Sequence, residues 1–209
     1  MKITVYHDTV CPFCRIGKRH LQQALQQWQG EPVQVEYRAF FLNPSIPPEG
    51  VDFLPYMQAK FNGRVDLRQA LDGPRRMGEA ARLTFHMDKI TKAPNSTLSH
   101  CLIALAPPEF REQVIEQVYA AYFEHGQDIG DIETLIQIGK KFEIEEDSLR
   151  RDLTSETVRA QVEAEAREAV RLGISGVPCF IINDKYVFSG AQPPEVITQI
   201  LQKVTKENA

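Results

Sequence analysis

The sequence predicts an α/β fold that is interrupted by an all-helical insertion. Residues 2–41 have the pattern strand, helix, strand, and residues 174–206 have the pattern strand, turn, strand, helix. Between them, helical periodicity dominates for about 110 residues. We therefore expect an α/β domain made of residues 1–43 and 154–209, and a helical insertion domain made of residues 44–153.

The N-terminal segment predicts a β-α-β unit. Ile3 and Val5 alternate with polar residues, which is typical of a strand. Pro12 suits the first turn of a helix over residues 12–28, and Gly30 is expected to end it. Residues 33–41 alternate again and predict a second strand. A helix of this length should connect two parallel neighbouring strands by a right-handed crossover.

The middle of the chain predicts helices joined by loops. A loop rich in Pro and Gly spans residues 43–50, and no strand is expected from Phe53 to Leu153. One helical face carries apolar side chains, namely Phe110, Val114, Val118, Ala121 and Tyr122.

The C-terminal segment completes the α/β pattern. A long helix is expected over residues 156–172, with Ser155 as its N-cap and Gly173 at its end. An apolar strand should begin at Pro178, since proline suits a strand start. Asn183-Asp184 predicts a turn to a further strand, and residues 194–206 predict a final helix.

Composition argues against a nucleic-acid or membrane partner. The chain has 209 residues, is 43% hydrophobic and carries a formal net charge of −4. This charge does not favour binding to nucleic acid or to anionic lipid. We see no apolar run of signal-peptide length and none near the roughly 18 residues of a membrane span, so we expect a cytoplasmic protein.

Two of the four cysteines form a Cys11-Pro12-Phe13-Cys14 motif at the predicted helix start. Residues three apart on a helix are surface neighbours, close enough for a disulfide after modest adjustment. Unpaired N–H groups and the helix dipole favour negative charge there, and the thiolate is the nucleophile. We assign Cys11, nearest the helix end and solvent, as the attacking thiol and Cys14 as the resolving thiol.

Two other readings of the motif stay open at this point. The thiols could be structural, or they could form half of a zinc site, for which His100, Cys101 and Cys179 are available. A strand before the motif and a helix after it favour redox chemistry, and we expect no bound metal.

Gly176-Val177-Pro178 lies far along the chain from the cysteine pair, and Cys179 follows it directly. Cys179 is either a buried apolar residue or a third redox thiol. His100 is a candidate charged neighbour for Cys11, although a helix histidine can also simply be packed or solvated. Asp8 either bonds near the motif or forms the loop.

Three segments together resemble the DsbA-like thioredoxin-fold family. They are Asp8-x-x-Cys11-Pro12-Phe13-Cys14-x-Ile16-Gly17-Lys18, the Gly176-Val177-Pro178 run, and the helical segment between them. Two further segments are similar to segments of its FrnE-type branch, which is related to 2-hydroxychromene-2-carboxylate isomerases. They are Asn95-Ser96-Thr97-Leu98-Ser99-His100 and Gly126-Gln127-Asp128-Ile129-Gly130-Asp131.

The resemblance implies a thioredoxin fold interrupted by a helical insertion. It implies Cys11 as nucleophile, Cys14 as resolving thiol, and Pro178 after a cis peptide bond, close to the pair. Pro12, Phe13, Val177, His100 and Cys179 would line the substrate site, with the Val177 backbone pairing with an extended substrate.

The sequence departs from the branch at three positions. Phe13 stands where Trp is usual, Cys179 where Thr or an aromatic residue is common, and Cys101 where Arg is common. The last two positions leave the substrate class open.

The function that follows is thiol–disulfide exchange with protein or small-thiol substrates, in a direction that the sequence leaves open. We expect no cofactor, with glutathione as a candidate thiol partner. The alternative is glutathione-dependent transfer or isomerisation, but the isomerase relatives tend to carry Ser where Cys11 stands. A zinc-binding thiol module is the third hypothesis. The oligomeric state is open.

Overall fold

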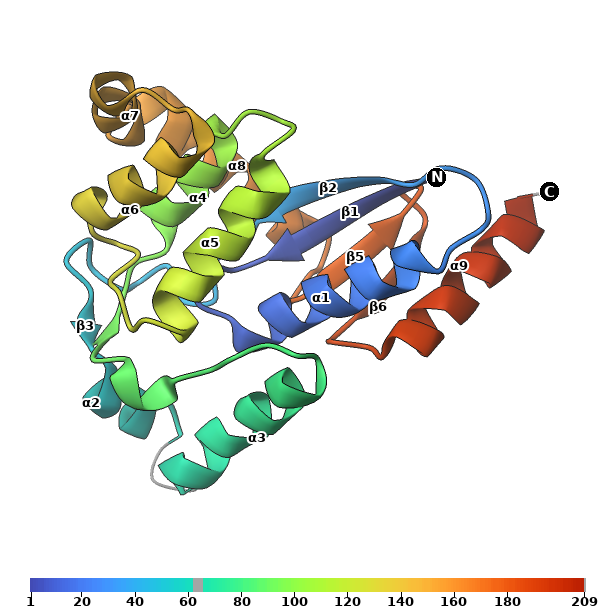
Figure 1. Cartoon of the computed structure of the whole chain (residues 1–209), viewed down its shortest axis with the longest axis horizontal. Coiled ribbons are helices and arrows are strands. Elements are labelled where there is room, and N and C mark those ends of the chain that lie inside the picture. Colours follow the sequence, from blue (N-terminus) through green and yellow to red (C-terminus); the bar gives the residue numbers. More distant parts are fainter. Residues whose placement is uncertain (62–65, 209) are drawn as a thin grey trace.

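The computed structural model describes residues 1–61 and 66–208, so residues 62–65 of the predicted helical block lie outside the described residues (Figure 1). The chain begins with β1 (Lys2–His7), α1 (Pro12–Gln26) and β2 (Gln34–Ala39). β1 and β2 are parallel, from Lys2 opposite Gln34 to His7 opposite Ala39. The predicted parallel β-α-β unit is therefore confirmed.

The end of the chain adds β5 (Cys179–Ile182), β6 (Tyr186–Ser189) and α9 (Pro194–Asn208) to the same sheet. The strand order is β2-β1-β5-β6, and β5 is antiparallel to both β1 and β6. Asn183 and Asp184 both have positive φ, 49° and 55°, which is the backbone of a tight two-residue hairpin. This confirms the predicted strand, turn, strand.

The two faces of the sheet bury different side chains because alternate residues of a strand point to opposite faces. Ile3, Val5 and Phe180 pack with residues of α1 and α9, which lie side by side in Figure 1. Tyr6 and Cys179 pack on the other face, with Phe40 of the segment after β2 and with Ala169 of α8. α8 runs over Glu156–Arg171.

The insertion between β2 and α8 is almost wholly helical. Its elements are β3 (Val51–Asp52), α2 (Phe53–Lys60), α3 (Leu67–Ala80), η1 (Met87–Lys89), β4 (Lys92–Ala93), α4 (Thr97–Leu105), α5 (Arg111–Phe123), α6 (Ile132–Gly139), η2 (Lys140–Phe142) and α7 (Glu146–Leu153). The prediction of no strand after Phe53 is wrong at β4, which pairs antiparallel with β3. Two residues are too few to show alternation, so only the tertiary pairing reveals this ladder.

Some element bounds also differ from the prediction. α1 ends at Gln26 with Gln27 as its C-cap, so Gly30 does not end it. A Cβ at Gly30 would lie 2.2 Å from the Trp28 ring, and this packing is what the glycine permits. Ser155 is the N-cap of α8 as predicted, although its side chain makes no capping hydrogen bond.

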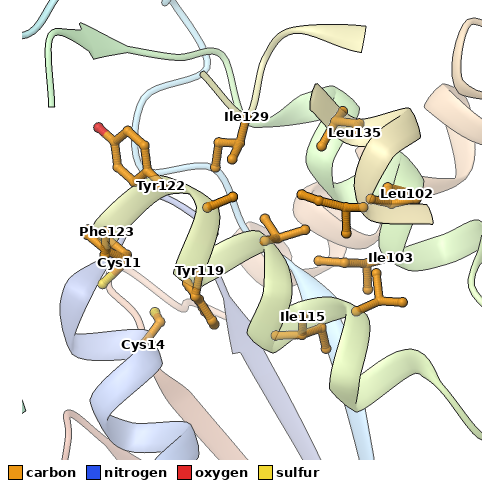
Figure 2. Packing of buried hydrophobic residues seen from close by; sticks show 14 of the residues in the cluster. Cys11, Cys14, Leu102, Ile103, Ile115, Tyr119, Tyr122, Phe123, Ile129 and Leu135 are labelled. Atoms are coloured by element: carbon orange, nitrogen blue, oxygen red, sulfur yellow. The ribbon is translucent and has the colours of Figure 1, made fainter. Parts of the chain in front are cut away.

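The largest cluster of buried apolar residues joins the start of α1 to the insertion. Cys11 and Cys14 belong to the same cluster as Leu102 of α4, Tyr119 of α5 and Leu135 of α6 (Figure 2). The helical insertion thus packs directly over the cysteine pair. The domain division at residues 43 and 154 stays a prediction.

Candidate active site

Cys11 is the N-cap residue of α1, with extended backbone at φ −98° and ψ 111°, and Pro12 begins the helix. Its carbonyl accepts the N–H of Cys14 at 3.1 Å, and its own N–H donates to the carbonyl of Asp8 at 3.1 Å. Because Pro12 has no N–H and a fixed φ, it suits this first turn. The sulfur of Cys11 therefore lies at the positive end of the α1 dipole.

The cysteine motif lies against the Val177–Pro178 loop, although more than 160 residues separate them in sequence. The Cys11 Sγ lies 3.7 Å from the carbonyl oxygen of Val177, as an S–H donor. The Val177–Pro178 peptide bond is cis. On α1, Gly17 permits this approach, because a Cβ there would lie 2.9 Å from Cγ of Pro178.

Both sulfurs are buried and free: Cys11 is 4% exposed and Cys14 is 2% exposed. The expectation that Cys11 lies towards solvent needs correction, because the insertion and the Val177 loop cover the helix start. Burial, followed by the hydrogen bond and charge of Cys11, raises the pKa of the Cys14 thiol well above its ordinary value. Cys14 is therefore held in the protonated form.

A cavity of about 290 Å³ gives access to Cys11. Its lining includes Cys11, Pro12, Phe13 and Val177 from the α/β part of the chain. The insertion supplies the rest of the wall, mainly apolar side chains of α2, α3 and α5 together with Leu42 and Asn43. Phe13 is 38% exposed at the edge of this cavity. Four predicted site residues thus meet in one space, which suits a disulfide carried on a mostly apolar ligand.

Asp8 organises the loop between β1 and α1. Its carboxylate is fully buried, and it accepts the N–H of Leu42 at 2.7 Å and that of Val10 at 3.4 Å. These two hydrogen bonds from backbone N–H groups fix the position of the carboxylate. Asp8 therefore joins the loop before Cys11 to the segment after β2, and it also borders the cavity.

His100 contacts Asp8 and other rings. Its Nε2 lies 3.6 Å from Oδ1 of Asp8, and it has no hydrogen-bond partner among the described residues. Its ring lies edge-on to those of His7, at 5.2 Å, and Phe41, at 5.7 Å. The structure thus places His100 next to Asp8, and it is not among the residues that line the Cys11 cavity.

Two further polar residues lie behind the pair, and the sequence alone did not single them out. The hydroxyl of Tyr119 shares a 2.9 Å hydrogen bond with Nδ1 of His7 and donates to the carbonyl of Asp8 at 3.4 Å. Figure 2 shows Tyr119 of α5 beside Cys14. Burial, followed by the charges of Cys14 and Cys11, raises the pKa of Tyr119 well above its ordinary value. Burial, then the charge of His100, lowers the pKa of His7 well below 6.5.

A buried charge network ties α1 to α5 one turn beyond the cysteines. Arg15 donates to Glu116 at 2.8 Å and 3.1 Å, to Glu124, and to the carbonyl of Thr84 at 3.0 Å. Lys18 lies 3.3 Å from Glu116, and burial lowers its pKa. Residues three apart on α1 share a face, but the acids they meet could not be found without the tertiary structure.

The remaining cysteines pack elsewhere. Cys179 lies on the sheet face covered by α8, with Tyr6, Phe40 and Ala169, and burial raises its pKa. Cys101 on α4 is fully buried, and burial raises its pKa to about 11. Within the described part of the chain, no group of three or more His, Cys, Asp or Glu side chains could hold a metal ion.

The two further segments that resemble the FrnE-type branch make contacts that hold the backbone near the start of α4 and α6. The Asn95 side chain donates to the carbonyl of Ile46 at 2.6 Å and accepts the N–H of Thr97 at 2.9 Å, so it fixes the start of α4. Gly126 has φ of +66° and approaches the Lys89 backbone, where a Cβ would lie 2.3 Å from the carbonyl oxygen. Asp131 caps α6 by accepting the N–H of Thr134 at 2.9 Å.

A cysteine pair at a helix N-terminus, held against a cis-proline loop, defines a thioredoxin-type redox centre. The model of the DSBA-like thioredoxin domain matches residues 2–202, so the chain belongs to this family and is a thiol–disulfide oxidoreductase of the DsbA-like type. Its sequence is 26% identical to YwbO of Bacillus subtilis (strain 168), an uncharacterized protein, over 98% of each chain.

Solved structures agree with this assignment. The probable DsbA oxidoreductase SCO1869 from Streptomyces coelicolor has a TM-score of 0.90 and 27% identity, covering 99% of this chain and 91% of that one. A 2-hydroxychromene-2-carboxylate isomerase has a TM-score of 0.72 and 16% identity, covering 100% and 98%. The cytosolic disulfide reductase DsbM from Pseudomonas aeruginosa, solved with GSH, has a TM-score of 0.66 and 17% identity, covering 99% and 100%. The last two show the shared fold.

Among the described residues, no helix is both long and apolar enough to cross a membrane.

Proposed function

We propose that the chain exchanges disulfides with polypeptide substrates through Cys11 and Cys14, and that it works in the reducing direction in the cytoplasm. One observation carries the proposal: Cys11, at the N-terminus of α1 and beside the Val177 carbonyl, opens onto a cavity, whereas Cys14 is buried with a raised pKa. The two thiols therefore have different environments, as an attacking and a resolving thiol need.

The reaction begins with attack of the Cys11 thiolate on one sulfur of the substrate disulfide. An S–S bond forms between Cys11 and that sulfur, and the other substrate sulfur leaves as a thiolate. Cys14 then attacks Cys11, releases the second substrate thiolate and closes the Cys11–Cys14 disulfide. Two electrons pass to the substrate, and the Cys14 proton passes to a released thiolate or to water.

The Val177 loop would hold the substrate during this step. An extended chain lying beside the loop can pair with the backbone of Val177, as in β-strand addition. The Val177 carbonyl, 3.7 Å from Cys11 Sγ, would direct the substrate backbone past the attacking sulfur. Phe13 and Leu42, both partly exposed at the cavity, would contact apolar side chains near the substrate cysteine.

Substrate trapping tests the assignment. Cys14→Ser should accumulate a mixed disulfide on Cys11, because the resolving thiol is lost. Cys11→Ser should fail to accelerate the reduction of insulin by dithiothreitol, whereas the matched control Cys101→Ser should behave as wild type. Full activity of Cys11→Ser, or adducts on Cys14→Ser that dithiothreitol does not release, would exclude the proposed roles.

Glutathione is the thiol partner that we propose for reduction of the Cys11–Cys14 disulfide that each exchange leaves. The cavity at Cys11 and the likeness to DsbM, solved with GSH, support this choice. Two glutathione molecules would give up two electrons to the Cys11–Cys14 disulfide and leave as glutathione disulfide. Cys14→Ser should be treated with glutathione disulfide and analysed by mass spectrometry. We expect one glutathionyl group on Cys11, and its absence would contradict the proposal.

A glutathione-dependent isomerase or transferase is the second candidate, since the fold is shared with 2-hydroxychromene-2-carboxylate isomerase. Such a reaction does not need a resolving thiol. Isomerase turnover that survives in Cys14→Ala, together with absent insulin reduction in wild type, would favour this candidate.

A further inference from the structure

A cavity lies next to the active site, and the function proposed above does not use it. This α8 groove, about 810 Å³ in volume, lies between α8, the segment 40–44 after β2 and the start of α4. Asn43 and Ser96 line both the α8 groove and the Cys11 cavity. The two spaces therefore share part of their walls, so a chain bound at Cys11 passes close to the groove.

Ser96 offers an unused hydrogen bond in the groove. It is the N-cap residue of α4, but its side chain caps no N–H, and its hydroxyl has no partner among the described residues. The residue is only 7% exposed. The hydroxyl is not among the buried side-chain atoms that lack a partner, so its oxygen is open to the groove and can pair with a ligand atom.

The charges at this end of the groove favour an anion. Asn95 already accepts the N–H of Thr97 in the first turn of α4, and the helix dipole adds positive potential at this end. Arg167 and Arg171 of α8 line the opposite side. Arg167 pairs with Glu163 at 3.4 Å, whereas Arg171 has no ion-pair partner among the described residues. Among the described residues of the lining, Glu163 offsets Arg167, and the guanidinium of Arg171 is left to bind a carboxylate.

The rest of the groove suits an extended polypeptide. Phe40, Phe41 and Pro44 supply apolar walls, and Val170 is 67% exposed at the rim. The volume is well above that of the Cys11 cavity, so the groove has room beyond the reacting sulfur for several residues. An apolar wall with a few placed polar groups is the usual composition of a ligand site.

We infer that the α8 groove binds an acidic segment of the polypeptide substrate, with an Asp or Glu carboxylate placed between Ser96 and Arg171. This inference rests on the proposed exchange function and names the substrate class that the site prefers. A carboxylate that pairs with an exposed arginine and with the Ser96 hydroxyl should improve KM by roughly twofold to fivefold over the matched amide. The chemistry at Cys11 is unchanged, so kcat should not differ.

The test uses a series of disulfide-linked peptide substrates. Each peptide carries one Glu, or one Gln at the same position, and that position varies from peptide to peptide on either side of the cysteine. The best Glu peptide should have a lower KM than its Gln twin in wild type. Arg171→Gln and Ser96→Ala should remove this difference, while Arg159→Gln, an exposed arginine of α8 outside the groove, should keep it. Added salt should shrink the difference, because exposed charges are screened.

Binding measured without exchange separates this inference from the function on which it rests. Anisotropy of a fluorescent Glu peptide with Ser in place of its cysteine, bound to Cys11→Ser, reports the groove alone. Weaker binding in Cys11→Ser/Arg171→Gln supports the inference even if no peptide is reduced. Equal binding of Glu and Gln peptides would overturn it. A competition result could also overturn it. If glutathione displaces the Glu peptide from the protein with Arg171 but not from the Arg171→Gln variant, the groove serves the small thiol.

Discussion

The contact between Gly17 and Pro178 gives a sharp prediction, because it sets how closely α1 approaches the Val177 loop. In Gly17→Ala, the new Cβ would lie 2.9 Å from Cγ of Pro178 and 3.3 Å from Cζ of Phe180. An ordinary contact begins at 3.4 Å, so the shortfall at Pro178 is 3.4 − 2.9 = 0.5 Å. The proline ring has no rotamer to change, and Phe180 is buried and stacked on Phe188 at 4.5 Å. Either α1 or the loop must therefore move.

The magnitude follows from two opposed effects. Overpacking of this kind costs about 1–3 kcal/mol, whereas alanine gains about 1 kcal/mol over glycine inside a helix. We expect a net loss of about 1 kcal/mol in the free energy of unfolding, which lowers Tm by about 2–4 °C in a domain of this size. The active site should suffer more, since a shift of about half an ångström at the Cys11–Val177 contact should slow disulfide exchange about tenfold.

Thermal unfolding followed by circular dichroism, and insulin reduction, measure both effects. Gly176→Ala is the matched control in the same loop, because a Cβ there meets nothing within 4 Å. It should leave Tm unchanged or slightly raised. A Gly17→Ala protein with the Tm of wild type and exchange within twofold of wild type would refute the idea that this close approach positions the loop.

Three further predictions concern the residues around the pair. Arg15→Gln should lower the free energy of unfolding by about 2–4 kcal/mol in urea titrations. The substitution leaves the carboxylates of Glu116 and Glu124 without their buried partner. The exposed Arg75→Gln on α3 should show no measurable change, and equal effects of the two variants would contradict the network. His7 has a lowered pKa in the fold, so the unfolded chain binds the extra proton first, and stability should fall as pH drops below 6.5. The free energy of unfolding should fall by up to about 1.4 kcal/mol per pH unit in wild type and by less in His7→Gln. Parallel plots of unfolding free energy against pH for the two proteins would count against this assignment. Cys179→Ala should exchange disulfides as fast as wild type, since Cys179 packs under α8, and a tenfold slower rate would place Cys179 in the reaction.

The local sequence pattern was sufficient to predict the strands and helices of the α/β part of the chain. The alternation at Ile3 and Val5, the Asn183-Asp184 turn and the periodicity before Gly173 each depend on neighbours within a few residues. The cysteine spacing likewise placed a thiol at the start of α1, because Pro12 and the helix period act locally. The resemblance to the DsbA-like family, carried by the same short segments, agrees with the family match.

The pairing of distant segments needed the tertiary structure. The two-residue ladder of β3 and β4 has too little sequence to show a pattern. Cys11 is buried because the insertion covers it, and no local rule shows what covers a helix end. The position of Cys179 depends on which sheet face α8 occupies.

The sequence by itself determined the chemistry of this protein, since thiol spacing, the proline and the helix start are properties of adjacent residues. The tertiary structure decided the environment: Asp8 beside His100, Arg15 against α5, and the groove that adjoins Cys11. The physical reason is one of range. Backbone geometry and capping act within one turn, whereas burial and electrostatic partners depend on side chains that folding brings together from far apart in the chain.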